Sequence, residues 1–217
     1  FMGSKFLLEK MRIREEQVVK LDYRGGGWPG TMVVQLADGS NLTIPYVGGW
    51  NAYWPIFSSF FFTPMRCIMC PDHTNELSDI SLGDAWLPEL KPWRFGESMI
   101  LTRTNAAENL LALASLAGAI SIRPVEPEKV KQSQAEPLKF KKNDLGARLA
   151  TLKSVGKEIP IFSPTPNSSI SFAAFLRTFF AYFNINASSK RSKSLLIHVP
   201  FPLFRLYYGL RKFLSLI

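Results

Sequence analysis

The stretch from Cys67 to Trp86 constrains this chain most, because it gathers reactive groups that the rest of the sequence uses sparsely. It holds both cysteines of the 217-residue chain, one of two histidines and four of seventeen acidic residues. Cys67 and Cys70 are spaced so that two thiolates can turn toward one point, which suits an iron–sulfur cluster, a zinc ion or a reversible disulfide. Pro71 stops a helix and predicts that both sulfurs lie on a loop. Two buried core thiols are the competing interpretation.

The segment from Ser78 to Ala85 reads as a short strand followed by a turn at Gly83 and Asp84. Together with the cysteines it resembles the Cys-x-x-Cys-x-Asp … Ala-Asp-Ile-Ser-x-Gly-Asp-Ala-Trp signature of the coenzyme F(420) hydrogenase/dehydrogenase beta-subunit family, in its C-terminal region. Ser78 stands where alanine is usual. Residues 23–30 are similar to the family's Tyr-Arg-x-x-x-Trp-x-Gly turn, and residues 101–104 to its Arg-Thr segment.

This resemblance implies an oxidoreductase subunit that passes electrons between a 4Fe-4S cluster, FAD and a two-electron acceptor such as a deazaflavin. By position in the family, Cys67 and Cys70 would be cluster ligands. The residues that the resemblance places near the flavin are Arg24, Gly26, Trp28, Asp79, Gly83, Asp84, Arg103 and Thr104. It assigns no catalytic acid or base.

A 4Fe-4S cluster normally takes four cysteine thiolates, and this chain supplies two. We therefore expect the other ligands from a missing N-terminal region, where family members carry further cysteines, or from a partner redox subunit. Zinc has the same shortage, because Pro71 constrains His73, which is expected to be a surface residue. Phe1 before Met2 favours a C-terminal fragment.

Several of these residues also have plainer interpretations. The run Arg24-Gly25-Gly26-Gly27 could admit a phosphate or a flavin edge to exposed amides, or be an ordinary hairpin connection. It is not a Rossmann fingerprint, because the spacing and the following helix are absent. The aromatic residues of 50–62 suit either core packing or a wall for a planar cofactor. Asp84 and Arg103 suit either a small-molecule site or an ion pair.

The predicted elements define an α+β fold, a mixed β-sheet flanked by helices, with a helical basic C-terminal tail. Strands are predicted over residues 18–24, 31–36, 42–46, 78–85, 98–103 and 119–125, and helices over 2–11, 105–116 and 143–155. The strand–helix–strand order over 98–125 predicts a right-handed crossover. The chain is expected to divide into a family-like domain (1–158), a proline- and serine-rich linker (159–169) and the tail (170–217).

The net charge of +9 is concentrated in the tail, because seven basic and no acidic residues follow Glu158. Arginine and lysine beside aromatic and leucine side chains predict either an interfacial helix on anionic lipid or helices docked on the core. No nucleic-acid-binding motif is present. The cysteine pattern does not fit a secreted disulfide framework, and residues 1–14 are too charged for a signal peptide. These features predict a cytoplasmic protein, peripheral to the inner face of the membrane.

Three functions remain open from the sequence. The first is an iron–sulfur flavoprotein oxidoreductase subunit. The second is a non-catalytic binding module that keeps the fold and docks to a membrane surface or partner protein through its tail. The third is a domain stabilised by zinc or by a dithiol.

Overall fold

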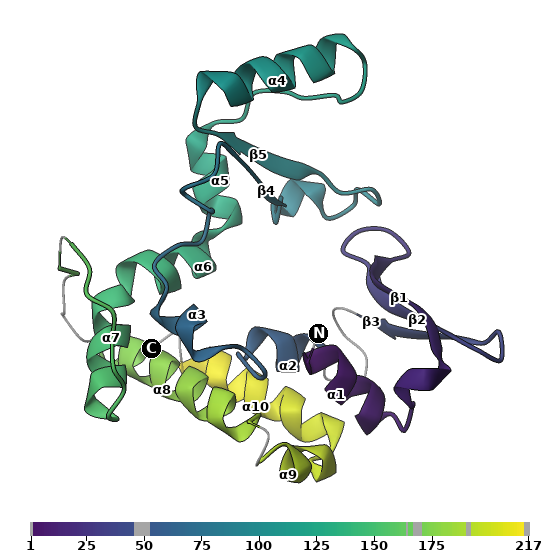
Figure 1. Ribbon diagram of the computed structural model, residues 1–217, viewed down its shortest axis with the longest axis vertical. Helices are drawn as coiled ribbons and strands as arrows, with labels where there is room; N and C mark the ends of the chain where they lie inside the picture. Colours follow the sequence, from purple (N-terminus) through teal and green to yellow (C-terminus); the bar gives the residue numbers. More distant parts are fainter. Residues whose placement is uncertain (1, 46–52, 164, 167–170, 190–191, 215–217) are drawn as a thin grey trace. The chain divides into compact units, whose positions relative to one another are not determined.

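The structure is a computed structural model that describes residues 2–45, 53–163, 165–166, 171–189 and 192–214. The chain forms two compact units (Figure 1). The first unit combines Phe1–Cys70 with Asp144–Ile217, and the second is Pro71–Asn143. The predicted α+β class is confirmed, but the strands form two separate antiparallel sheets instead of one mixed sheet.

The first unit contains a three-stranded meander with the strand order β1-β2-β3. Its strands are β1 (Val18–Gly25), β2 (Thr31–Leu36) and β3 (Asn41–Pro45), in agreement with the sequence. The β2–β3 turn is closed by Asp38, whose side chain accepts a 2.9 Å hydrogen bond from the Ser40 amide. Gly39 provides the positive φ of +84° that this turn requires.

The first unit also contains helices. They are α1 (Met2–Lys10), α2 (Tyr53–Ser58), α3 (Met65–Met69), α7 (Leu145–Ser154), α8 (Phe172–Ala187), α9 (Lys193–His198) and α10 (Phe201–Leu214). Ser171 caps the start of α8, because its hydroxyl accepts a 3.1 Å hydrogen bond from the Ala174 amide. No helix within the described ranges is both long and apolar enough to cross a membrane.

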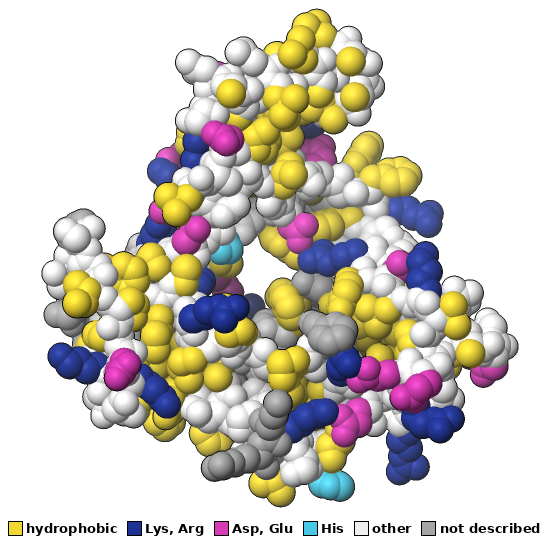
Figure 2. All heavy atoms as spheres, in the orientation of Figure 1, with side chains coloured by type: hydrophobic (Ala, Val, Ile, Leu, Met, Phe, Trp, Pro, Cys, Tyr) yellow, Lys and Arg dark blue, Asp and Glu magenta, His cyan; other side chains and the backbone are white. Residues whose placement is uncertain are grey.

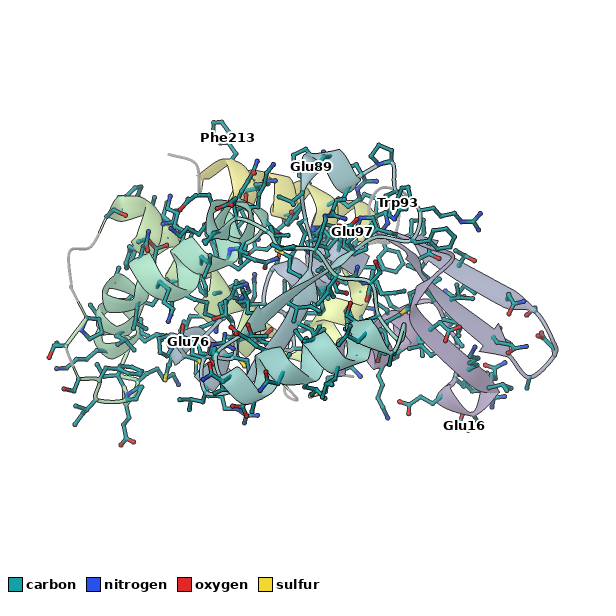
Figure 3. All side chains as sticks on the ribbon, turned by 90° about the horizontal axis from the view of Figure 1, so that it is seen from above. Glu16, Glu76, Glu89, Trp93, Glu97 and Phe213 are labelled. Atoms are coloured by element: carbon teal, nitrogen blue, oxygen red, sulfur yellow. The ribbon has the colours of Figure 1, made fainter. Side chains whose placement is uncertain are left out.

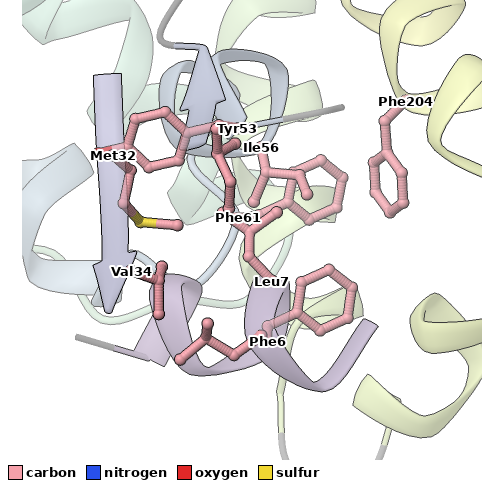
Figure 4. Close-up of a cluster of buried hydrophobic side chains, with 10 residues drawn as sticks. Phe6, Leu7, Met32, Val34, Tyr53, Ile56, Phe61 and Phe204 are labelled. Carbon is pink, nitrogen blue, oxygen red and sulfur yellow. The ribbon is translucent and has the colours of Figure 1, made fainter. Parts of the chain in front are cut away.

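The main hydrophobic core joins the N-terminal elements to the tail (Figure 4). Phe6 of α1 is completely buried and forms edge contacts with Phe204 of α10, at 6.3 Å between ring centroids. The other core residues are Leu7, Leu8, Met32, Val34, Ile44, Tyr53, Ile56 and Phe61. Burial of Tyr53 and Phe61 favours core packing for the aromatic segment, although Trp50 lies outside the described residues.

The second unit is built around the antiparallel pair β4 (Ile80–Asp84) and β5 (Ser98–Thr102). Its helices are α4 (Asn105–Leu116), α5 (Pro127–Ser133) and α6 (Ala135–Leu138), followed by a π-helical turn over Lys139–Asn143. The predicted strand 98–103 and helix 105–116 are confirmed, and so is a strand within 78–85. The turn predicted at Gly83 and Asp84 is wrong, because both residues pair with β5 inside β4.

The strand predicted over 119–125 is wrong, and with it the crossover. Its apolar residues Ile122 and Val125 are exposed, so burial of apolar side chains does not stabilise a strand there. Pro124 also lacks the amide hydrogen that a strand ladder needs.

Candidate functional site

The two cysteines lie at the end of α3 in the first unit. Cys67 is inside the helix, and Cys70 follows it with extended backbone angles of φ −78° and ψ 130°. Proline disfavours helical geometry in the residue before it, so Pro71 explains this end. The expectation that both cysteines lie on a loop is therefore wrong for Cys67. Neither forms a disulfide, and both residues are half-buried.

A buried cation lies behind these cysteines. Arg148 of α7 is fully buried, and its guanidinium donates hydrogen bonds of 2.8 Å from Nε to the Ile68 carbonyl and 3.1 Å from Nη2 to the Cys70 carbonyl. Burial lowers the pKa of Arg148 to about 10, while Asp144 and Cys70 act in the opposite direction. Arg148 is therefore charged at neutral pH and fixes the backbone on both sides of Met69.

A second guanidinium belongs to the same charge cluster. Arg177 of α8 pairs with Asp144, the residue before α7, at 2.7 Å between Nη2 and Oδ2, and both side chains are largely buried. Arg148, Arg177 and Asp144 together carry one net positive charge. This net charge lies beside the cysteine segment, because Arg148 bonds the Cys70 carbonyl.

The two cysteines could supply half of the ligands of a four-cysteine cluster site. Across the residues that the structure describes, no group of three or more histidine, cysteine, aspartate or glutamate side chains is placed to hold a metal. Cys67 and Cys70 could supply two thiolates at the surface of the first unit. The remaining ligands of a four-cysteine site would have to come from other polypeptide.

The glycine-rich turn connects β1 to β2. The Arg24 guanidinium donates to the Pro29 carbonyl at 3.2 Å and lies 5.5 Å from the centre of the Trp28 ring. Gly26 has a φ of +79°. A Cβ on Gly30 would come within 2.8 Å of the Gly27 carbonyl oxygen. The turn thus brings Arg24 and Trp28 together, and backbone geometry alone accounts for Gly26 and Gly30.

Arg103 in the second unit binds the loop that precedes β4. Its Nη1 donates to the Ser78 carbonyl and the Ser81 hydroxyl, each at 3.1 Å, and its Nη2 donates to the Thr74 carbonyl at 2.8 Å. The side chain is nevertheless exposed. The sequence left open that Arg103 is one half of an ion pair, but these three acceptors are two carbonyls and a hydroxyl.

Thr104 and Asp79 complete this connection. The Thr104 hydroxyl donates to Asp79 Oδ1 at 3.0 Å and accepts a 3.3 Å bond from the Ala107 amide, so it caps α4. The Arg103 amide donates to the Asp79 carbonyl at 2.9 Å. The Arg-Thr segment and Asp79 thus hold β4, β5 and α4 together, whatever else they bind.

A pocket of about 220 Å³ opens beside β4 and β5, wholly within the second unit. Gly83 lines it, and a Cβ there would meet no atom within 4 Å. On its other wall Gln134 bonds to His73 at 3.0 Å and to the Asp84 carbonyl at 2.8 Å. His73, expected at the surface, is half-buried in this pocket. Ligand pockets typically measure about 300–1,000 Å³, so this one suits a fragment of a cofactor such as a ring or a phosphate.

The predicted site residues therefore fall into two groups. Cys67, Cys70, Arg24, Gly26 and Trp28 belong to the first unit, and Asp79, Gly83, Asp84, Arg103 and Thr104 belong to the second. Sequence reasoning missed Arg148 and Gln134. Arg148 has a sequence signal, because it shares one helical face with Leu145, Leu149 and Leu152, where a charged residue is unusual.

Comparison with known proteins covers the part of the chain that holds these motifs. The family that matches, over residues 2–128, is described as the C terminus of the beta subunit of coenzyme F(420) hydrogenase/dehydrogenase. The chain therefore belongs to this family, and the predicted resemblance is confirmed. At a coarse level the family indicates an oxidoreductase.

A curated relative is the coenzyme F(420) hydrogenase subunit beta of Methanothermobacter thermautotrophicus, which is 26% identical over 157 residues. The match covers 71% of this chain and 48% of the relative, so the chain spans about half the length of that protein. No solved structure matches the chain.

Proposed function

We propose that this chain is part of an iron–sulfur flavoprotein oxidoreductase in which Cys67 and Cys70 supply two of four ligands to a 4Fe-4S cluster. The observation that carries the proposal is the buried Arg148 guanidinium, bonded to the carbonyls of Ile68 and Cys70. It orients both cysteines and supplies positive charge beside an anionic centre. The other two ligands come from further sequence of the same protein or from a partner redox subunit.

The flavin side of the proposal has candidate residues in each unit. Arg24 and Trp28 offer a cation and an aromatic face on an exposed turn, which suit a phosphate and a planar ring. The second unit offers the pocket lined by Gly83, with Asp79, Asp84, Arg103 and Thr104 close in sequence to its strands. When bound, FAD would exchange electron pairs with a two-electron acceptor such as a deazaflavin, and the cluster would exchange single electrons. The chain's own residues hold, orient and shield these groups.

A second candidate function is a non-catalytic binding module that keeps the family fold and docks to a membrane surface or partner protein through its tail. The exposed apolar and basic face of α10 favours it. Under both candidates we propose a cytoplasmic location. A tail that binds membrane would hold the protein at the inner face of the membrane. Visible absorption separates them, and also separates a cluster from a zinc site, because zinc is colourless.

Anaerobic reconstitution with iron and sulfide tests the cluster. When the remaining sequence of the protein or its partner subunit is supplied, the wild-type chain is expected to gain absorbance near ~400 nm. Cys67→Ser and Cys70→Ser are each expected to lose most of it. A matched control is Met69→Leu, on the same short helix, which should behave as wild type. Equal absorbance in wild type and both serine variants would overturn ligation by this pair.

A further inference from the structure

The C-terminal helix α10 has two different faces. On one face Phe204 is 4% exposed and packs in the core, Tyr207 donates a 2.8 Å hydrogen bond to Asn184 Oδ1, and Arg211 donates to the Ser58 carbonyl at 3.2 Å. These contacts come from α8 and from the end of α2. These contacts fix the rotation of α10 about its own axis, so that its other face points to solvent.

The outward face carries an apolar stripe. Leu203, Leu206, Leu210 and Phe213 are 51%, 70%, 55% and 62% exposed, and their spacing of three, four and three residues aligns them along the helix. Figure 3 shows Phe213 pointing away from α10. Four large apolar side chains aligned along one helix form a contiguous patch, which marks an interaction surface.

Basic side chains lie next to this stripe. Arg205 and Lys212 are exposed and seven residues apart, so they fall on one line beside the apolar residues. Seven basic and no acidic residues occur over 159–217, so the whole segment carries one sign of charge. Figure 2 shows further lysine and arginine side chains on the visible surface of the molecule.

We propose that this face of α10 docks onto an anionic lipid surface, with the four apolar side chains entering the headgroup region and Arg205 and Lys212 contacting lipid phosphates. A helix with leucine and phenylalanine on one sector and cations beside it is the pattern of an interfacial helix. The long basic side chains can reach the headgroups while their stems lie along apolar surface. This inference rests on the second candidate function above, to which it adds the lipid class and the contacting residues, and it does not depend on the redox function.

Pairing with a second copy of the helix fits less well. α10 has 14 residues, about two heptads, whereas coiled-coil pairing is recognised over at least three or four. Acidic partners for Arg205 and Lys212 would also be needed across such an interface, and the tail sequence contains none.

Vesicle flotation of the complete chain tests the proposal. The chain is expected to float with phosphatidylcholine vesicles containing about 30 mol% phosphatidylglycerol at about 0.1 M salt, and to bind pure phosphatidylcholine at least tenfold more weakly. Leu206→Glu with Phe213→Glu should weaken binding to the anionic vesicles at least tenfold. Arg205→Gln with Lys212→Gln should weaken anionic binding and leave neutral binding unchanged.

The matched control is Leu113→Glu with Leu116→Glu on α4, because these leucines are 65% and 85% exposed in the other unit. It should bind like wild type. Equal binding by the α10 and control variants would overturn the proposal, and so would a dimer in sedimentation velocity that the Leu206→Glu, Phe213→Glu variant abolishes. If that variant does not fold, hydrogen exchange of the wild-type chain decides. Protection over 201–214 on adding anionic vesicles supports the proposal, and unchanged exchange there overturns it.

Discussion

The guanidinium of Arg148 donates a hydrogen bond to the carbonyl oxygen of Cys70 at 3.1 Å, from a helix 78 residues further along the chain. This contact ties α7 to the cysteine segment and brings a buried positive charge close to it. Both cysteine residues are half-buried. One residue thus connects the packing of the first unit to its most reactive segment.

Replacing Arg148 should lower the stability of the fold. Arg148→Met leaves the Ile68 and Cys70 carbonyls without their donor, and we expect the free energy of unfolding to fall by about 2–4 kcal/mol in urea titration. Arg148→Lys keeps the charge but not the two-pronged geometry, so it should lose less. Arg123→Ala is the control: it breaks an exposed pair with Glu97 and should cost about 0.5 kcal/mol or less. A methionine variant as stable as wild type would contradict this role.

The Thr104 cap offers a test of the second unit. Thr104→Ala removes both the cap of α4 and the bond to Asp79, and it should lower stability by about 1–2 kcal/mol. Hydrogen exchange over 105–116 should accelerate, while Thr104→Ser should restore wild-type protection. If exchange is unchanged and only flavin affinity falls, Thr104 contacts ligand and the structural role is wrong.

Gly30 and Gly39 form a matched pair for the glycine-rich turn, because both have positive φ, at +86° and +84°. A Cβ at Gly30 would lie 2.8 Å from the Gly27 carbonyl, whereas one at Gly39 meets nothing within 4 Å. Thermal unfolding should therefore show Gly39→Ala losing about 1 kcal/mol and Gly30→Ala clearly more. Equal losses would mean that steric contact at Gly30 is unimportant.

The stability of the first unit should fall in alkaline solution. Burial raises the pKa of Tyr207, while its bond to Asn184 acts in the opposite direction. The unfolded phenol therefore loses its proton first as pH passes about 10, and the unfolded state gains stability. Wild type should exceed Tyr207→Phe by about 1 kcal/mol near pH 8, and this difference should shrink toward pH 11. A difference independent of pH would contradict a raised pKa.

Local sequence signals predicted most of the elements correctly. Asp38-Gly39 between two strand-like segments is a hairpin signal, and the alanine- and leucine-rich run over 105–116 indicates the helix α4. The 119–125 strand failed because alternating apolar residues mean a strand only where a partner strand and burial are available. A local sequence pattern shows neither the partner strand nor the burial.

The candidate site was only partly accessible from sequence for the same reason. The cysteine spacing and the Arg-Thr segment are local motifs, so they could be recognised. The contact of Arg148 with Cys70 and that of Gln134 with His73 depend on tertiary packing across 78 and 61 residues. A charged residue on the apolar face of 145–152 was the one available signal for Arg148.

The most direct test of the central claim is an anaerobic visible spectrum of the purified chain, with iron and acid-labile sulfide measured on the same sample. When the chain is reconstituted together with the remaining sequence of the protein or its partner subunit, we predict absorbance near ~400 nm with bound iron and sulfide, and loss of both in Cys67→Ser. Flavin absorbance bands that stay with the protein after FAD is added would show that the chain also binds the second cofactor. A colourless protein after reconstitution with iron, sulfide and FAD, supplied together with the remaining sequence of the protein or its partner subunit, would contradict it.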